Sequence, residues 1–171
     1  MAGQLIQVAT STVTTPVASV DLVGINDDSV YMVTVTNAKH ETTDDYLYQR
    51  VLVSSSPDIS ANYDLAGKQL CADVVFINQA NTNQTQVQAY IGMGQDNGEK
   101  ANFISYLYNF YNASQFSSAT IEQSSMDSSS RFRSIQGSWV HTVAQSCNGI
   151  QFYAGGSRNL DSGTFTLYKV V

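Results

Sequence analysis

Residues 148–171 read NGIQFYAGGSRNLDSGTFTLYKVV, and this stretch decides the fold expected for the whole chain. Ile150 and Phe152 alternate with Gln and Tyr in its first part, and Phe165 and Leu167 alternate with Thr and Tyr in its last part. A period of two places alternate side chains on opposite faces of a β-strand. The glycine-rich segment between the two parts suits a loop. The stretch therefore predicts two strands of a sandwich joined by an exposed loop.

The same alternation recurs along most of the chain, with polar and turn-forming residues between the apolar segments. Further strands are expected at residues 18–23, 30–36, 47–53, 71–77, 87–91, 102–111 and 132–143. Loops are expected at residues 37–45, 78–85 and 124–130, while 58–70 fits either a strand or a loop packed on itself. No amphipathic helix pattern interrupts the series. We therefore predict an all-β fold, an antiparallel β-sandwich of jelly-roll type with about eight to ten strands.

The chain length, 171 residues, fits one domain, and no linker or composition break divides it. Residues 1–16 are expected to form either an edge strand or an arm that reaches a neighbour. Large aromatic side chains are the usual material of a core. The aromatic residues expected in the core are Phe103, Trp139, Phe152 and Phe165.

Charge excludes several classes of partner. Charged residues make up 13% of the chain, the net charge is −6, and only eight residues are basic. A nucleic-acid binder needs clustered Lys and Arg, and Arg131 with Arg133 is the nearest approach to a cluster. We therefore expect no nucleic acid as a partner, and the same balance argues against an anionic membrane surface.

The sequence contains neither a signal peptide pattern nor an apolar run that approaches the roughly 20 residues of a membrane span. We therefore expect the protein to be made and assembled in a cytoplasm. The two cysteines, Cys71 and Cys147, both lie on predicted strands. Because free cysteine packs as a small hydrophobic residue, we expect buried thiols rather than a disulfide.

No motif indicates catalysis or a bound metal. His40 and His141 are isolated in the sequence, without the spacing of a structural zinc site. The aspartate pairs at 27–28 and 44–45 lack the spacing of a calcium loop. No nucleophile sits in a glycine elbow. We therefore expect no enzyme activity, no cofactor and no metal.

The ten tyrosines favour a role in contacts, because Tyr combines an apolar body with a polar tip and is enriched at interfaces. Four of them are expected either at the rim of the core or on a contact surface, and Arg158 and Asn159 of the terminal loop are added to that candidate surface. The candidate contact residues are Tyr106, Tyr108, Tyr111, Tyr153, Arg158 and Asn159.

The two ends of the sequence resemble a family of tailed-bacteriophage virion proteins. The segments GIQF (149–152) and SGTFTLY (162–168) are similar to the family's C-terminal pattern, in which I-x-F, a glycine-rich loop and S-G-x-F-x-L-Y follow one another. Segments 19–25 and 30–33 resemble the family's N-terminal hairpin, and YLYQR (46–50) resembles its third strand. The resemblance implies a β-sandwich in the virion, in a capsid-decoration, tail or fibre role.

We therefore predict a non-enzymatic virion structural protein that acts through contacts with other capsid or tail proteins. Low charge and a Thr-rich N-terminal segment predict a homo-oligomer, of which a trimer is one possible form. The alternative is a receptor- or carbohydrate-binding module at a fibre tip. In that case residues 78–85 and 155–162 would supply amides and hydroxyls, with a tyrosine as platform.

Overall fold

The computed structural model describes residues 3–41, 46–73, 75–89, 92–93, 96, 98–156 and 158–171. These residues form thirteen strands in two antiparallel sheets and contain no helix. Accordingly, no helix in the described ranges is long and apolar enough to cross a membrane. The predicted all-β sandwich is confirmed, with more strands than expected.

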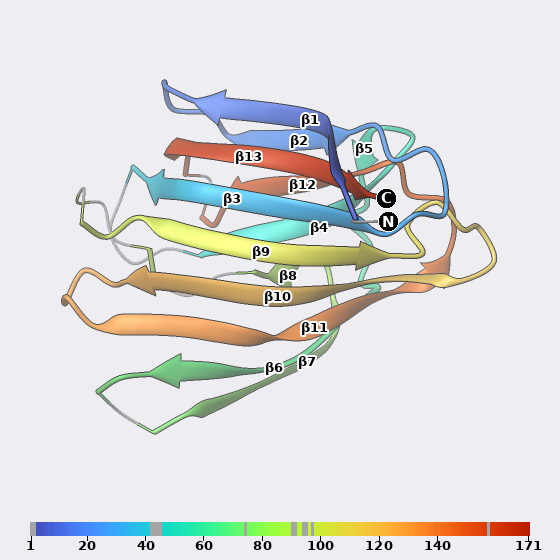
Figure 1. Cartoon of the computed structure of the whole chain (residues 1–171). Helices are drawn as coiled ribbons and strands as arrows, with labels where there is room; N and C mark the ends of the chain where they lie inside the picture. The colour runs from blue at the N-terminus through green and yellow to red at the C-terminus, as the bar shows by residue number, and fades with distance from the viewer. Residues whose placement is uncertain are drawn as a thin grey trace.

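The two sheets differ in width (Figure 1). In spatial order, the larger sheet contains β1 (Leu5–Val13), β13 (Leu160–Val170), β3 (Tyr31–His40), β9 (Ala101–Tyr108), β10 (Phe116–Met126), β11 (Phe132–Ala144), β6 (Tyr63–Cys71) and β7 (Ile77–Gln84). The smaller sheet contains β2 (Ser19–Val23), β12 (Gly149–Ala154), β4 (Leu47–Val53) and the two short strands β5 (Ser56–Pro57) and β8 (Val87–Gln88), which both pair with β4.

Eight of the strands have jelly-roll connectivity, and we call them the frame. In the larger sheet they lie in the order β1-β13-β3-β9, and in the smaller sheet in the order β2-β12-β4-β8. Along the chain, six of the seven steps between frame strands cross from one sheet to the other, which is how a jelly roll wraps two sheets around one core. The other strands are insertions: β5, β6 and β7 lie between β4 and β8, and the β10–β11 hairpin lies between β9 and β12. The insertions widen the larger sheet to eight strands.

The core lies between the two sheets of the frame. Phe152 of β12 contacts Phe103 of β9 and Phe165 of β13, with ring centroids 6.0 and 5.5 Å apart. All three rings are buried, as is Trp139, so the four predicted core aromatics are confirmed. Each such side chain contributes about 2–3 kcal/mol by leaving water.

The two strands predicted in the terminal stretch are present as β12 and β13, in different sheets. β13 is bordered by β1 on one side and β3 on the other, while β12 belongs to the smaller sheet. The glycine-rich segment after β12 therefore carries the chain from one sheet to the other. β1 is an edge strand paired with β13, which is one of the two alternatives left open for the N-terminal residues.

Three expectations about loops are wrong. β3 continues to His40, because Asn37 adopts a positive φ of 55° and the register shifts there without ending the strand; residues 42–45, including the aspartate pair at 44–45, lie outside the described residues. The predicted loop at 78–85 is mostly β7, and the predicted strand at 71–77 is mostly the connection between β6 and β7. Residues 124–126 close β10 instead of beginning a loop.

The β7 error has a physical cause. Within the described part of the chain β7 pairs with β6 alone and lies at the edge of the larger sheet, so most of its side chains face water. A strand without a buried face needs no apolar alternation, and the segment is rich in Asn and Gln. The ambiguous residues 58–70 contain most of β6, and of the strand expected at 87–91 only Val87–Gln88 is a strand among the described residues.

The turn between β10 and β11 is held by one buried carboxylate. Asp127 accepts hydrogen bonds from the backbone N–H groups of Ser129 and Arg131 and from both Arg131 Nε and Arg133 Nε, at 2.8–3.0 Å. Arg133 Nη1 also pairs with Asp73 at 3.0 Å. Burial alone would raise the pKa of Asp127, but these donors outweigh it and lower that pKa.

Candidate functional site

The outer face of the larger sheet carries two of the predicted contact residues. Tyr106 and Tyr108 point outward from β9 and are 40% and 37% exposed, while the alternate residues Phe103 and Leu107 face the core. Ile104, which the sequence did not single out, is exposed in the same row of β9. These three side chains form an apolar strip on the sheet surface.

Around this strip the outer face consists largely of uncharged hydroxyl residues. Thr10 and Thr12 of β1 lie opposite Thr166 and Thr164 of β13, with hydroxyl oxygens 3.0 and 3.3 Å apart. Cross-strand Thr pairs stabilise a sheet modestly. They leave a regular surface with little charge for a partner to desolvate.

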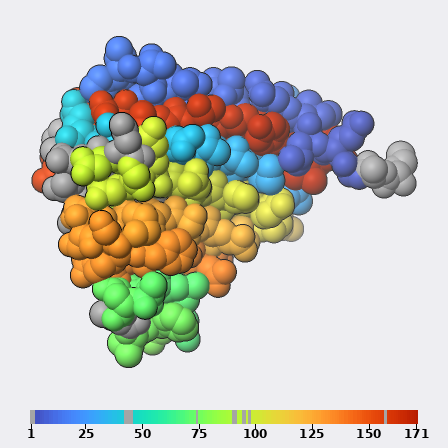
Figure 2. All heavy atoms as spheres, turned by 60° about the vertical axis from the view of Figure 1, so that its left-hand side comes forward, coloured from blue at the N-terminus to red at the C-terminus, as the bar shows by residue number. Residues whose placement is uncertain are grey.

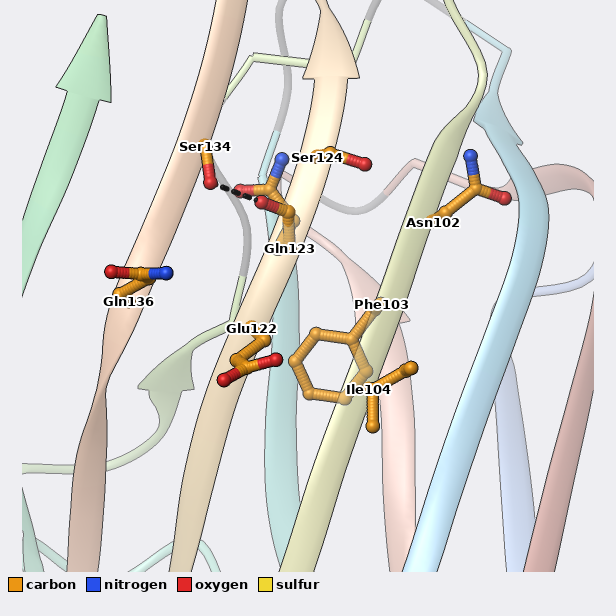
Figure 3. Close-up of a pocket in the computed structure, with 8 residues that line it drawn as sticks. All are labelled: Asn102, Phe103, Ile104, Glu122, Gln123, Ser124, Ser134 and Gln136. Carbon is orange, nitrogen blue, oxygen red and sulfur yellow. Dashed lines mark hydrogen bonds between the residues drawn. The ribbon is translucent and has the colours of Figure 1, made fainter.

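Two shallow hollows lie on this face beside the strip. Figure 3 shows the first, of about 290 Å³, where Ile104, Glu122 and Gln136 project from β9, β10 and β11. The side chains that line it make few hydrogen bonds with one another. The Ser134 hydroxyl donates a hydrogen bond to the backbone carbonyl of Gln123 at 2.6 Å. The second hollow, of about 470 Å³, extends from Tyr108 toward β6 and β7. The described residues that line these two hollows include no acidic side chain paired with a basic one.

The β6–β7 hairpin ends in exposed apolar side chains. Val75, Phe76 and Ile77 are 82%, 62% and 44% exposed, and Phe132 at the start of β11 is 46% exposed. Phe132 belongs to the same end of the sheet, because its carbonyl accepts a hydrogen bond from the N–H of Ala72. In Figure 2 the hairpin, in green, stands out from the body of the molecule. We call Val75, Phe76, Ile77 and Phe132 the apolar tip.

A polar groove lies at the smaller sheet. Tyr48 of β4 and Tyr153 of β12 stack on its outer side with centroids 5.6 Å apart, and the Arg50 guanidinium lies 4.5 Å from the centre of the Tyr153 ring. The Tyr153 hydroxyl donates to Gln86 Oε1 at 2.7 Å. Burial raises the pKa of Tyr153 to about 12, although Arg50 opposes the shift, so this hydroxyl stays protonated at neutral pH.

Two adjoining hollows, of about 520 and 180 Å³, make up this groove and share Tyr48 and Gln86. Its larger hollow is lined by residues of β4 and β12, by the two glycines that follow β12, and by Arg158. The smaller one lies between β8 and the inserted β6 and β7 strands. Its polar lining is Tyr48, Asn81, Gln84, Gln86 and Gln88, and we call the two hollows together the amide groove.

The six predicted contact residues do not form one surface. Tyr106 and Tyr108 lie on the outer face of the larger sheet, whereas Tyr153 and Arg158 line the amide groove. Tyr111 is exposed in the connection after β9, and Asn159 is half-buried, with its carbonyl accepting the N–H of Glu41.

The sequence analysis missed the groove residues Tyr48, Gln86 and Gln88. The alternation at 46–53 could have shown that Tyr48 points away from the core, since Leu47, Gln49 and Val51 are its buried neighbours. Nothing in the sequence shows that residues 48, 86 and 153 meet, because they come together only through strand pairing.

The buried nucleophiles and imidazoles belong to the packing. His141 is fully buried, and its Nε2 lies 2.9 Å from Asp58 Oδ2. Cys71 and Cys147 are free thiols, as predicted, and burial raises the pKa of Cys147 even though Ser117 donates a hydrogen bond to it. Among the described residues, no group of three or more His, Cys, Asp or Glu side chains is placed to hold a metal ion.

No family model matches the chain, and no curated protein or solved structure matches it either. The resemblance of its two ends to phage virion proteins therefore stays a prediction. The candidate contact surfaces of the chain are the outer face of the larger sheet, the apolar tip and the amide groove.

Proposed function

We propose that the chain is a non-enzymatic structural component of a bacteriophage particle, a capsid-decoration protein or part of a tail or fibre, that acts through protein–protein contacts. The resemblance at both ends of the sequence points to this role. The single observation that carries it in the structure is the apolar tip, which exposes large side chains that the fold does not use.

Exposure of the apolar tip to water is energetically unfavourable in an isolated molecule. Val75 and Phe76 contribute almost nothing to the core, yet they place contiguous apolar surface in water. Exposed patches of this kind indicate a surface that a partner covers. Since the tip projects on a hairpin, it suits insertion into a recess of a neighbouring subunit (Figure 2).

The edge of the same hairpin supports a protein partner. β7 offers eight residues without a single charge or proline, and its outer backbone groups have no neighbouring strand among the described residues. Natural sheets usually protect such an edge with charge, proline or a covering segment. The proposed partners are therefore other virion proteins or further copies of this chain, in a homo-oligomer such as a trimer, assembled in the host cytoplasm and retained in the virion.

The proposal is tested by assembly with particles that lack this protein. The double variant Val75→Ser with Phe76→Ser is expected to lose particle binding by about tenfold or more while it stays folded, because both side chains are exposed. Ile59→Ser is the matched control, since Ile59 is 65% exposed but lies outside the tip. Equal particle binding by the wild type and the double variant would overturn the role of the tip. Failure of the wild-type chain to bind any particle would overturn the structural role.

A further inference from the structure

The amide groove has the composition of a site for hydroxyl-rich ligands. Each side-chain amide has a donor and an acceptor next to each other, which matches a pair of neighbouring hydroxyls on a sugar ring. Four such amides line the smaller hollow, and two tyrosines, Tyr48 and Tyr153, line the larger one. From this arrangement we propose that the amide groove binds a neutral oligosaccharide.

The amide at the centre of the groove is held in place before any ligand arrives. Arg50 Nη2 donates to Gln86 Oε1 at 3.0 Å, and the Tyr153 hydroxyl donates to the same oxygen at 2.7 Å. Arg50 is itself fixed by a 2.9 Å hydrogen bond from its Nε to the carbonyl of Thr85. With its oxygen occupied, Gln86 has its Nε2 group left to donate. A donor fixed in this way loses little conformational entropy on binding.

The other amides of the groove have free hydrogen-bonding capacity. The side chains of Asn81 and Gln88 make no hydrogen bond among the described residues, and Gln84 uses only its Nε2, toward the carbonyl of Thr82. Asn81 and Gln84 come from β7 on one side, and Gln88 comes from β8 on the other. A ligand in the groove would therefore be held from both sides.

The charge of the groove selects for a neutral ligand. Among the described residues that line it there is no carboxylate and no lysine, and the charged side chain in its lining is Arg158, in the larger hollow. The guanidinium of Arg50 is already engaged with Gln86, Thr85 and the Tyr153 ring. The whole chain carries a net charge of −6, which disfavours an acidic glycan.

The size of the groove fits a short oligosaccharide. The larger hollow, at about 520 Å³, lies within the range of about 300–1,000 Å³ typical of small-molecule sites. The smaller hollow, at about 180 Å³, continues from it past Tyr48 and Gln86. This binding would be additional to the structural role proposed above, because the groove and the apolar tip share no residue.

The test begins with the full chain on an array that carries neutral glycans beside sialylated, uronic-acid and sulfated glycans. A neutral glycan bound on the array is then titrated as the free oligosaccharide by isothermal calorimetry. Gln88→Ala is expected to weaken this binding by about tenfold, which corresponds to the loss of one to two hydrogen bonds. Gln86→Ala is expected to weaken it more, because that change also releases Arg50 and Tyr153. Gln136→Ala, on the outer face of the larger sheet, is the matched control and is expected to bind like the wild type.

Three results would overturn the proposal: no neutral glycan bound at millimolar concentration, binding of acidic glycans alone, or an affinity that neither Gln88→Ala nor Gln86→Ala changes. Thermal unfolding of each variant separates a lost contact from a lost fold. The particle assay distinguishes the two proposals, since Gln88→Ala is expected to keep particle binding and the Val75→Ser, Phe76→Ser variant is expected to keep glycan binding.

Discussion

The frame and the inserted hairpins bury their strands in different ways. In the frame, β9 alternates strictly between buried and exposed residues, because its inner face meets the smaller sheet. In the insertions, β7 exposes most of both faces, and the apolar residues next to it are in water. The inner face of β9 is therefore covered by the core, whereas the β6–β7 hairpin leaves large apolar side chains exposed at its end. The amide groove lies where the two regions meet.

The largest effect is expected at the centre of the frame. Phe152→Ala removes the ring that contacts both Phe103 and Phe165 across the two sheets, and it is expected to cost about 4 kcal/mol of unfolding free energy. Urea unfolding followed by tryptophan fluorescence measures this loss. A loss below about 1 kcal/mol would mean that the sheets do not pack through this ring.

The inserted β10–β11 hairpin is expected to depend on one carboxylate. Asp127→Ala leaves Arg133 buried without that partner and is expected to cost about 3 kcal/mol in the same unfolding experiment. Asp28→Ala, an exposed aspartate with one side-chain hydrogen bond, is the control and is expected to cost about 0.5 kcal/mol or less. Equal losses of unfolding free energy in the two variants would contradict this role of Asp127.

The close approach of β6 and β11 gives an intermediate effect. A Cβ on Gly137 would lie 2.5 Å from the carbonyl oxygen of Ala66 and 2.7 Å from the Cα of Gly67, so the two strands would have to separate. Gly137→Ala is expected to cost about 2 kcal/mol, whereas Gly98→Ala, with open space around it, is expected to be close to neutral. Differential scanning calorimetry compares the two. An unchanged melting temperature in Gly137→Ala would show that the inserted strands have room to move apart.

Acidic pH is expected to destabilise the β10–β11 hairpin through protonation of Asp127. The pKa of Asp127 is lower in the folded chain than the usual value of about 3.9, so its contribution is complete above that value and is lost as the pH falls through the folded pKa. Unfolding free energies measured from pH 6 to pH 3 are expected to fall less steeply in Asp127→Asn than in the wild type. Parallel curves would assign the acid sensitivity to other carboxylates.

The smallest effect concerns access to the two thiols. Cys147 is fully buried and its pKa is raised, whereas Cys71 ends the inserted strand β6 and is 5% exposed. Local opening exposes edge hairpins before a core, so an alkylating reagent is expected to modify Cys71 before Cys147 in the folded protein. Mass spectrometry of the alkylated peptides gives the order. Simultaneous modification would indicate that the frame and the insertion open together.

The sequence predicted most strands that have one buried face, in the frame and in β11 alike, because such a strand must alternate. The terminal stretch, the core aromatics and the strands at 47–53 and 132–143 all follow this rule. The rule fails for β7, whose residues have no core to face, and for the apolar residues 75–77, which resemble a buried strand but lie in water. Apolar periodicity in a sequence indicates which strands have one buried face. It therefore cannot identify a strand with no buried face, or apolar residues that the fold leaves exposed.

The sequence by itself determined that this chain builds antiparallel sheets, that Phe103, Trp139, Phe152 and Phe165 face the core, and that its two cysteines are buried free thiols. Tertiary structure alone decided that the insertions widen one sheet and that Tyr48, Gln86 and Tyr153 meet in one groove. The physical reason is the separation of the residues along the sequence. Alternation within one strand is a local consequence of burial, whereas strand order and register bring together residues that are distant in the chain. The backbone hydrogen bonds that join these strands depend little on residue type, because every residue except proline carries both a backbone donor and an acceptor.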